Sequence, residues 1–226
     1  MISIRRPQSA TRRSAAFSLI EMLIVIAIIA ILLGMVAMTT TQQIKGMEFN
    51  AAVADIGSLM EEARQVALIE NRDVQIRIYR HALAASPTTD YRAIAIGHVV
   101  PISDPTETDY GDPTQYPFEP IGQIYRLPVG VRFIDSTTHS TLLTAASMTS
   151  GFEMIASPDS NTPINAEYRA FQITPHEGAA LPINTAAPWT LTLGPQFDKA
   201  HTSGLPINFA TFTVSPQTGK ASLTRP

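Results

Sequence analysis

The chain of 226 residues contains no cysteine, which excludes disulfides and metal sites built from thiolates. It also lacks proline between Pro7 and Pro87, although sixteen of its seventeen prolines lie from Pro87 onward. Because proline breaks the interior of a helix, this gap predicts one long uninterrupted helix ahead of a proline-rich remainder. A chain of this length has room for one such helix and one globular domain.

Motifs for catalysis and for nucleic-acid binding are also missing. No G-x-S-x-G, P-loop or dinucleotide-binding pattern occurs, and the net charge of −3 argues against general affinity for nucleic acid, which requires a basic face. The acids Asp55, Glu61 and Glu62 are expected on a solvated helix face rather than as a catalytic pair. The histidines have no ligand spacing, so we expect surface or loop positions rather than a zinc site: His81, His98, His139, His176 and His201.

One long hydrophobic run is present, at residues 17–38, and residues 22–38 are all apolar apart from one glycine. As a helix it is about long enough to cross a bilayer core of roughly 30 Å. Four arginines and no acid precede it, against Lys45 alone just after it. By the positive-inside rule we expect a cytoplasmic N-terminus and a location outside the inner membrane for everything after about residue 41.

A single acid, Glu21, interrupts the apolar end of this run. A carboxylate without a partner is costly inside a membrane, although less so near a helix end than at its centre. If the chain were cut just before Phe17, the new α-amine would lie one helical turn from Glu21. An ion pair between the two, within one chain or with a neighbouring subunit, would offset the burial of both charges.

Residues 12–21, RRSAAFSLIE, resemble the prepilin signal of type IV pilins and type II secretion pseudopilins. The resemblance implies cleavage by prepilin peptidase between Ala16 and Phe17, N-methylation of Phe17, and a role for Glu21 in filament assembly. This chain has Ala16 where the family usually has glycine, and it lacks the early helix proline of many pilus-building members. A secretory signal peptide, a twin-arginine signal and a plain signal anchor are the alternatives for this segment.

The sequence predicts an α+β pilin-like fold in which the helix continues to about Asn71 as an amphipathic segment and packs on an antiparallel sheet. We expect the chain to divide into four segments: a cleaved leader at 1–16, a transmembrane or filament-core helix at 17–41, an amphipathic continuation at 42–71 and an extracytoplasmic β-rich domain at 72–226. One apolar stripe is expected to face the sheet: Phe49, Val53, Ile56, Met60, Ala63 and Ala67. Gly46 and Gly57 are expected to mark flexing or close packing.

Alternating and β-rich runs predict strands at 74–79, 91–100, 168–173, 189–193, 209–214 and 221–224, with a loop around Pro87 and a turn feeding a strand at 127–133. Gly219 is expected to supply the positive φ of a terminal hairpin. The segment 127–133, LPVGVRF, and this hairpin are similar to minor pseudopilins of the GspH type, including pilin-like proteins of the Verru_Chthon cassette type. Residues 136–150 fit either a short helix or a strand.

The proline-rich loop at 101–120 is the one place where a hard cation could bind. It carries four acids that can offer oxygen ligands to calcium: Asp104, Glu107, Asp109 and Asp112. They do not match an EF-hand, and a solvated loop is the favoured interpretation, so no cofactor is expected.

The resemblance implies a structural, non-enzymatic subunit of a type II secretion or type IV pilus-like filament. Its partners would be other pilin or pseudopilin subunits, prepilin peptidase, the inner-membrane assembly platform and membrane lipid. Two alternatives stay open: a membrane-anchored periplasmic binding module that forms no filament, and a tethered periplasmic enzyme. The second would need a constellation of catalytic groups, which the sequence does not offer.

Overall fold

The computed structural model describes residues 18–83, 86–101, 117–146, 148–157, 162–183, 188–196 and 205–226; side chains are not described at 35–42, 83 and 86–88. Internal contacts divide the chain into two units, Met1–Ile44 and Lys45–Pro226. The first contains the N-terminal part of helix α1, and the second contains the rest of α1 and the sheet.

Helix α1 runs from Leu19 to Glu70 and contains no proline. Its C-terminal end is set by Asn71, which adopts a left-handed conformation with φ of 49°. The N–H of Arg72 then donates to the carbonyl of Ala67 at 3.3 Å, the six-to-one hydrogen bond of a Schellman motif. The predicted end of the helix near Asn71 is therefore confirmed.

The six residues of the predicted apolar stripe are all buried, from Phe49 at 8% exposed to Ile56 at 0%. They join one core cluster with residues from strands far apart in the sheet, such as Ile76 of the strand after the helix and Phe212 near the C-terminus. A Cβ atom at Gly57 would lie 3.5 Å from the ring of Phe212, which is an ordinary van der Waals contact, and one at Gly46 would meet no atom within 4 Å. Close packing therefore does not require glycine at either position.

The described residues form an eleven-stranded antiparallel sheet, with eight strands in the order β11-β10-β9-β5-β2-β1-β7-β6. Strands β3 and β4 pair with β2, and β8 pairs with β7. The bounds are β1 Val74–Leu83, β2 Ser86–Val99, β3 Phe118–Pro120, β4 Tyr125–Arg126, β5 Val131–Phe133, β6 Thr149–Ile155, β7 Ile164–Thr174, β8 Gly178–Ala179, β9 Trp189–Pro195, β10 Ala210–Val214 and β11 Ala221–Thr224, with a short helix α2 at Thr141–Thr144. An N-terminal helix followed by this sheet is the predicted α+β pilin-like architecture.

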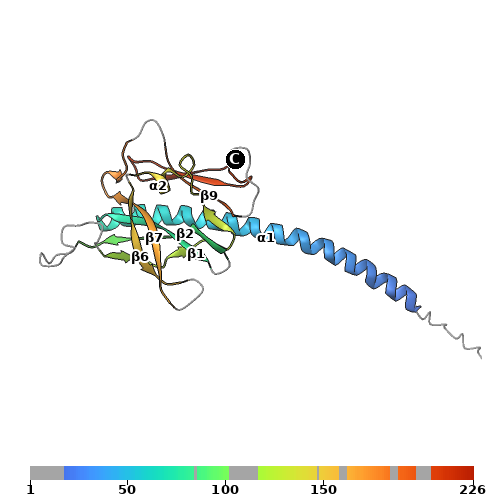
Figure 1. The fold of residues 1–226 in the computed structure, drawn as a ribbon. Coiled ribbons are helices and arrows are strands. Elements are labelled where there is room, and N and C mark those ends of the chain that lie inside the picture. Colours follow the sequence, from blue (N-terminus) through green and yellow to red (C-terminus); the bar gives the residue numbers. More distant parts are fainter. Residues whose placement is uncertain are drawn as a thin grey trace, which may run out of the picture. The chain divides into compact units, whose positions relative to one another are not determined.

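The sheet curves around the part of α1 that follows Lys45, so strands β1, β2, β6 and β7 lie on one side of it and β9 on the other (Figure 1). The face of β1 and β7 turned away from α1 carries a second, smaller core. There the guanidinium of Arg77 lies 4.1 Å from the ring centre of Phe118 and 4.2 Å from that of Tyr168. This face is therefore closed by cation–π contacts as well as by apolar packing.

The predicted strands and the terminal hairpin are all found, with Gly219 at φ 64°. Pro87, expected in a loop, instead lies inside β2, at a register shift between β1 and β2 where a proline can be tolerated. The end of the predicted loop at 101–120 is strand β3, while residues 102–116 lie outside the described residues. The undecided segment 136–150 contains both α2 and the start of β6.

Candidate assembly site

The start of α1 is organised by Ser18 and Glu21. The Oγ of Ser18 accepts a hydrogen bond from the backbone N–H of Glu21 at 3.2 Å, and its carbonyl accepts from the N–H groups of Glu21 and Met22. This is the Ser-x-x-Glu spacing of a helix N-cap, and an acid in the first turn is also favoured by the helix dipole. Glu21 is exposed, and Ala16 and Phe17 lie outside the described residues.

Large apolar side chains cover every side of the helix beyond Glu21. Between Leu19 and Leu33 they are 44% to 84% exposed. A helix that is hydrophobic all round normally lies in a membrane or inside a larger assembly, and an exposed apolar surface of this size marks an interaction site. Within the part of the chain that the structure describes, no helix is both long and apolar enough to cross a membrane.

Two histidines differ from the expectation of surface or loop positions, whereas His139 and His176 lie in turns as expected. His81 and His98 are buried, at 5% and 7% exposed. The ring of His98 lies 2.7 Å from the carboxylate of Glu70 and 2.9 Å from the carbonyl of Asp73, so it links the end of α1 to β2. The sequence pattern missed this because both partners come from the helix terminus rather than from a ligand motif.

Metal ligands are not gathered anywhere in the described part of the chain: no three His, Asp or Glu side chains lie close enough to hold an ion. The four acids of the predicted calcium loop, Asp104, Glu107, Asp109 and Asp112, lie outside that part, as does His201.

The acids on the outer face of α1 bind neighbouring side chains. Asp55 accepts a hydrogen bond from the hydroxyl of Tyr125 at 2.8 Å, and burial together with this bond raises the pKa of Tyr125 above its ordinary value. Glu61 accepts hydrogen bonds from Arg64 and Gln65. Asp55 thus has a structural partner on β4 that its helical spacing alone did not predict.

A buried charge cluster that the sequence analysis missed lies where β2 meets β5. Arg92 is 1% exposed and donates to Asp90 at 3.1 Å, and Arg132 donates to the other carboxylate oxygen at 2.9 Å. Burial alone would raise the pKa of Asp90, but the hydrogen bonds and charges of Arg132 and Arg92 outweigh it and hold the pKa below its ordinary value. Arg92 is the extra residue of a β-bulge opposite Tyr79 and Arg80, and short-range alternation gives no signal for it.

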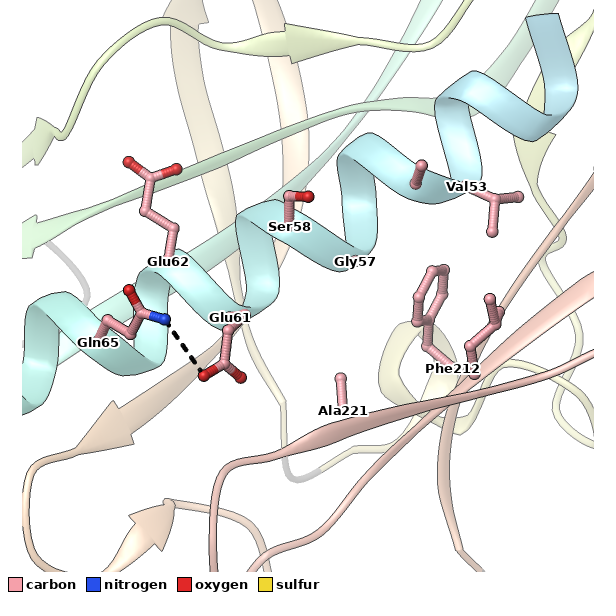
Figure 2. A pocket seen from close by; sticks show the side chains of 10 residues that line it. Val53, Gly57, Ser58, Glu61, Glu62, Gln65, Phe212 and Ala221 are labelled. Atoms are coloured by element: carbon pink, nitrogen blue, oxygen red, sulfur yellow. Dashed lines mark hydrogen bonds between the residues drawn. The ribbon is translucent and has the colours of Figure 1, made fainter. Parts of the chain in front are cut away.

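A groove of about 580 Å³ runs between α1 and the C-terminal hairpin of β10 and β11 (Figure 2). Val53, Ala54 and Gly57 line it from the helix, and Phe212 and Leu223 from the hairpin. Glu61 and Glu62 also line it. No local sequence pattern predicts this groove, because it is formed by two segments more than 140 residues apart.

Residues 11–37 match the family model of the prokaryotic N-terminal methylation motif. The match covers the basic segment, the predicted cleavage site and the start of α1. No curated protein and no solved structure matches the chain. The match is limited to this N-terminal segment, and it contains residues 12–21, whose resemblance to prepilin signals is described above.

Proposed function

We propose that this protein is a structural, non-enzymatic subunit of a type II secretion or type IV pilus-like filament. The observation that carries the proposal is the N-terminal part of α1, whose apolar side chains are exposed on every side. Glu21 is the only charged residue between Arg13 and Lys45. None of the apolar side chains between Leu19 and Leu33 joins a core cluster of the described residues.

Prepilin peptidase would remove residues 1–16 and leave Phe17 as a methylated N-terminus. Glu21 lies in the first turn of α1, so the new amine would start one helical turn away. Removing one member of a buried ion pair is costly because the other charge is left without compensation. The pair between Glu21 and an N-terminal amine therefore gives each subunit a fixed axial position among its neighbours.

The apolar part of α1 would hold the subunit in the inner membrane in contact with lipid before assembly. The arginines ahead of it favour a cytoplasmic N-terminus and a periplasmic sheet domain. In the filament the same surface would pack against other pilin or pseudopilin subunits, with an inner-membrane assembly platform handling the transfer.

Among such subunits, a minor pseudopilin of the GspH type is the assignment we favour. The support is the segment 127–133, where a turn closed by the N–H of Val131 and the carbonyl of Pro128 leads directly into β5. The hairpin of β10 and β11 at the C-terminal end of the sheet is the second similarity.

The replacement of Glu21 by Gln or Ala tests the proposal. In cells with an assembly machinery, we expect the amount of the variant in sheared filament fractions to fall more than tenfold, while its amount in the membrane stays unchanged. Glu48→Gln, which changes an exposed acid farther along the same helix, serves as the matched control and should assemble normally. Normal assembly of both Glu21 variants would contradict the proposal and favour a membrane-anchored binding module.

A further inference from the structure

The sheet ends in two edge strands, β11 on one side and β6 on the other, and each is paired on one side within the described residues. Unpaired edges carry backbone N–H and C=O groups that can accept another strand. The groove described above lies directly beside β11, since Ala221 and Leu223 line it. A strand added to β11 would therefore place its side chains over the groove.

The groove is bounded along α1 by two hydrogen bonds that attach the hairpin to the helix. Arg64 donates to the carbonyl of Thr218 at 3.0 Å, and Arg225 donates to the side-chain oxygen of Asn50 at 2.8 Å. Between them the helix presents small residues, Ala54, Gly57 and Ser58. The hairpin contributes the ring of Phe212, which is directed toward the helix (Figure 2). The space thus offers a mostly apolar floor beside an open strand edge.

The other edge strand, β6, exposes large apolar side chains. Phe152 is 71% exposed and Met154 is 63% exposed. Ser150 lies opposite Arg169 of β7, and Arg169 lies opposite Ile78 of β1. The side chain of Ile78 belongs to the core under α1, so Ser150 lies on the helix-side face. Because side chains alternate along a strand, Phe152 and Met154 lie on this same helix-side face.

Charge and proline do not protect the edge of β6. The strand contains no proline, and its only charged residue is Glu153. The carboxylate of Glu153 accepts hydrogen bonds from Arg77 at 2.9 Å and from Tyr79 at 2.7 Å, so it lies on the opposite face. Natural sheets usually guard exposed edges with such residues, and β6 lacks this protection where Phe152 and Met154 lie.

Strand direction decides how the two edges can meet. Seven antiparallel pairings separate β11 from β6 along the path of eight strands, so the two edge strands run in opposite directions. If the free edge of β6 in a second copy pairs antiparallel with β11, the two sheets continue each other. Their helix-side faces then point the same way. Leu223 lies opposite Phe212 on that face, so Phe152 and Met154 of the added strand would point into the groove.

We propose that the groove between α1 and the C-terminal hairpin receives strand β6 of a second copy of this chain. The contact is head-to-tail, with different surfaces on the two copies, and such contacts generate open arrays rather than closed dimers. The inference deepens the proposed function, on which it rests, by naming the partner surface of the sheet domain within the assembly.

The absence of cysteine permits a direct test on the full chain. Thr149→Cys on β6 and Thr224→Cys on β11 change two threonines on the face turned away from α1, and a short bismaleimide is then added to membranes of cells that also produce prepilin peptidase. We expect the double variant to give a ladder of cross-linked dimers, trimers and larger species. Each single variant alone should stay monomeric, and a mixture of the two should give only dimers.

Phe152→Lys in the double-cysteine chain should abolish the ladder, because a charge on the edge prevents strand addition. Ile183→Lys changes a side chain that is equally exposed, at 74%, but lies on neither edge strand, and should leave the ladder intact. The mature N-terminus is measured on the same samples. Processed chains without a ladder, a ladder that survives Phe152→Lys, or cross-linking of Thr149→Cys alone would overturn the inference. A ladder formed by unprocessed chains would instead contradict only the proposed function.

Discussion

Two stretches of the same helix show opposite relations to their surroundings. Ile24, in the N-terminal part of α1, is 52% exposed, whereas Ile56, farther along, is completely buried against the sheet. Both stretches are helical without interruption, so helix formation itself does not distinguish them. The difference lies in the pattern: the first is apolar on all sides, and the second on one stripe only.

This difference indicates where each stretch finds its stabilisation. Full burial of a Leu, Ile or Val side chain is worth about 1.5–3 kcal/mol. The stripe from Phe49 to Ala67 gains this within the chain, through the core under the sheet. The apolar side chains between Leu19 and Leu33 can gain this burial free energy only from contact with another molecule, either lipid or a neighbouring helix.

The largest effect is expected where the sheet domain depends on an internal partner. Asp90→Asn removes the carboxylate that neutralises Arg92, which is 1% exposed. Leaving a buried charge without its partner typically costs about 3–5 kcal/mol, and we expect a loss of about 3 kcal/mol in the free energy of unfolding. The single, buried Trp189 provides the fluorescence signal for denaturant unfolding of the full chain in detergent.

The same pair predicts a pH dependence. Folding lowers the pKa of Asp90. Its contribution to the free energy of unfolding is therefore fully present above the ordinary pKa of about 3.9. This contribution is lost as the pH falls through the lower pKa of the folded state. Asp90→Asn should flatten this acid limb, while Glu177→Gln, at an exposed position, should leave the free energy and its pH profile unchanged. An unchanged free energy of unfolding in Asp90→Asn would show that the cluster does not stabilise the domain.

A matched pair of isoleucines sharpens the contrast between the two stretches. Ile56→Ala should lower the free energy of unfolding of the sheet domain by about 3 kcal/mol, because it opens a cavity in a packed core. Ile29→Ala, where the side chain is 48% exposed, should change the same quantity by less than about 0.5 kcal/mol. Denaturant unfolding followed by Trp189 fluorescence measures both. Equal losses in the two variants would break the comparison.

The smallest effect is expected at the first residue of the helix. Ser18→Ala removes the oxygen that caps the N–H of Glu21, a loss of about 1 kcal/mol in local helix stability. Amide hydrogen exchange should therefore become about fivefold faster at Glu21, with no change around Ile56. An unaltered exchange rate at Glu21 would mean that the cap does not hold the start of the helix.

Local patterns were sufficient to predict the helix and most of the sheet. The stripe repeats every three to four residues, and β1 alternates with a period of two, so each element signals its own buried face. The N-terminal signal is likewise contiguous, and the match at residues 11–37 falls on it.

Features built from distant segments could not be predicted in this way. Strand β6 contains Gly151 and Glu153 and lacks strong alternation, and it is defined by pairing with β7. Pro87 lies in a strand because a register shift accommodates it. The groove is lined by residues of α1 and of the C-terminal hairpin, and no local spacing encodes their meeting.

The most direct test of the central claim is the mass of the mature N-terminus, measured on chain purified from cells with an active prepilin peptidase. The account predicts a chain that begins at Phe17 and carries one added methyl group on its amine, which places that amine one turn from Glu21. A chain that still begins at Met1, or one cut beyond Met38, would contradict it.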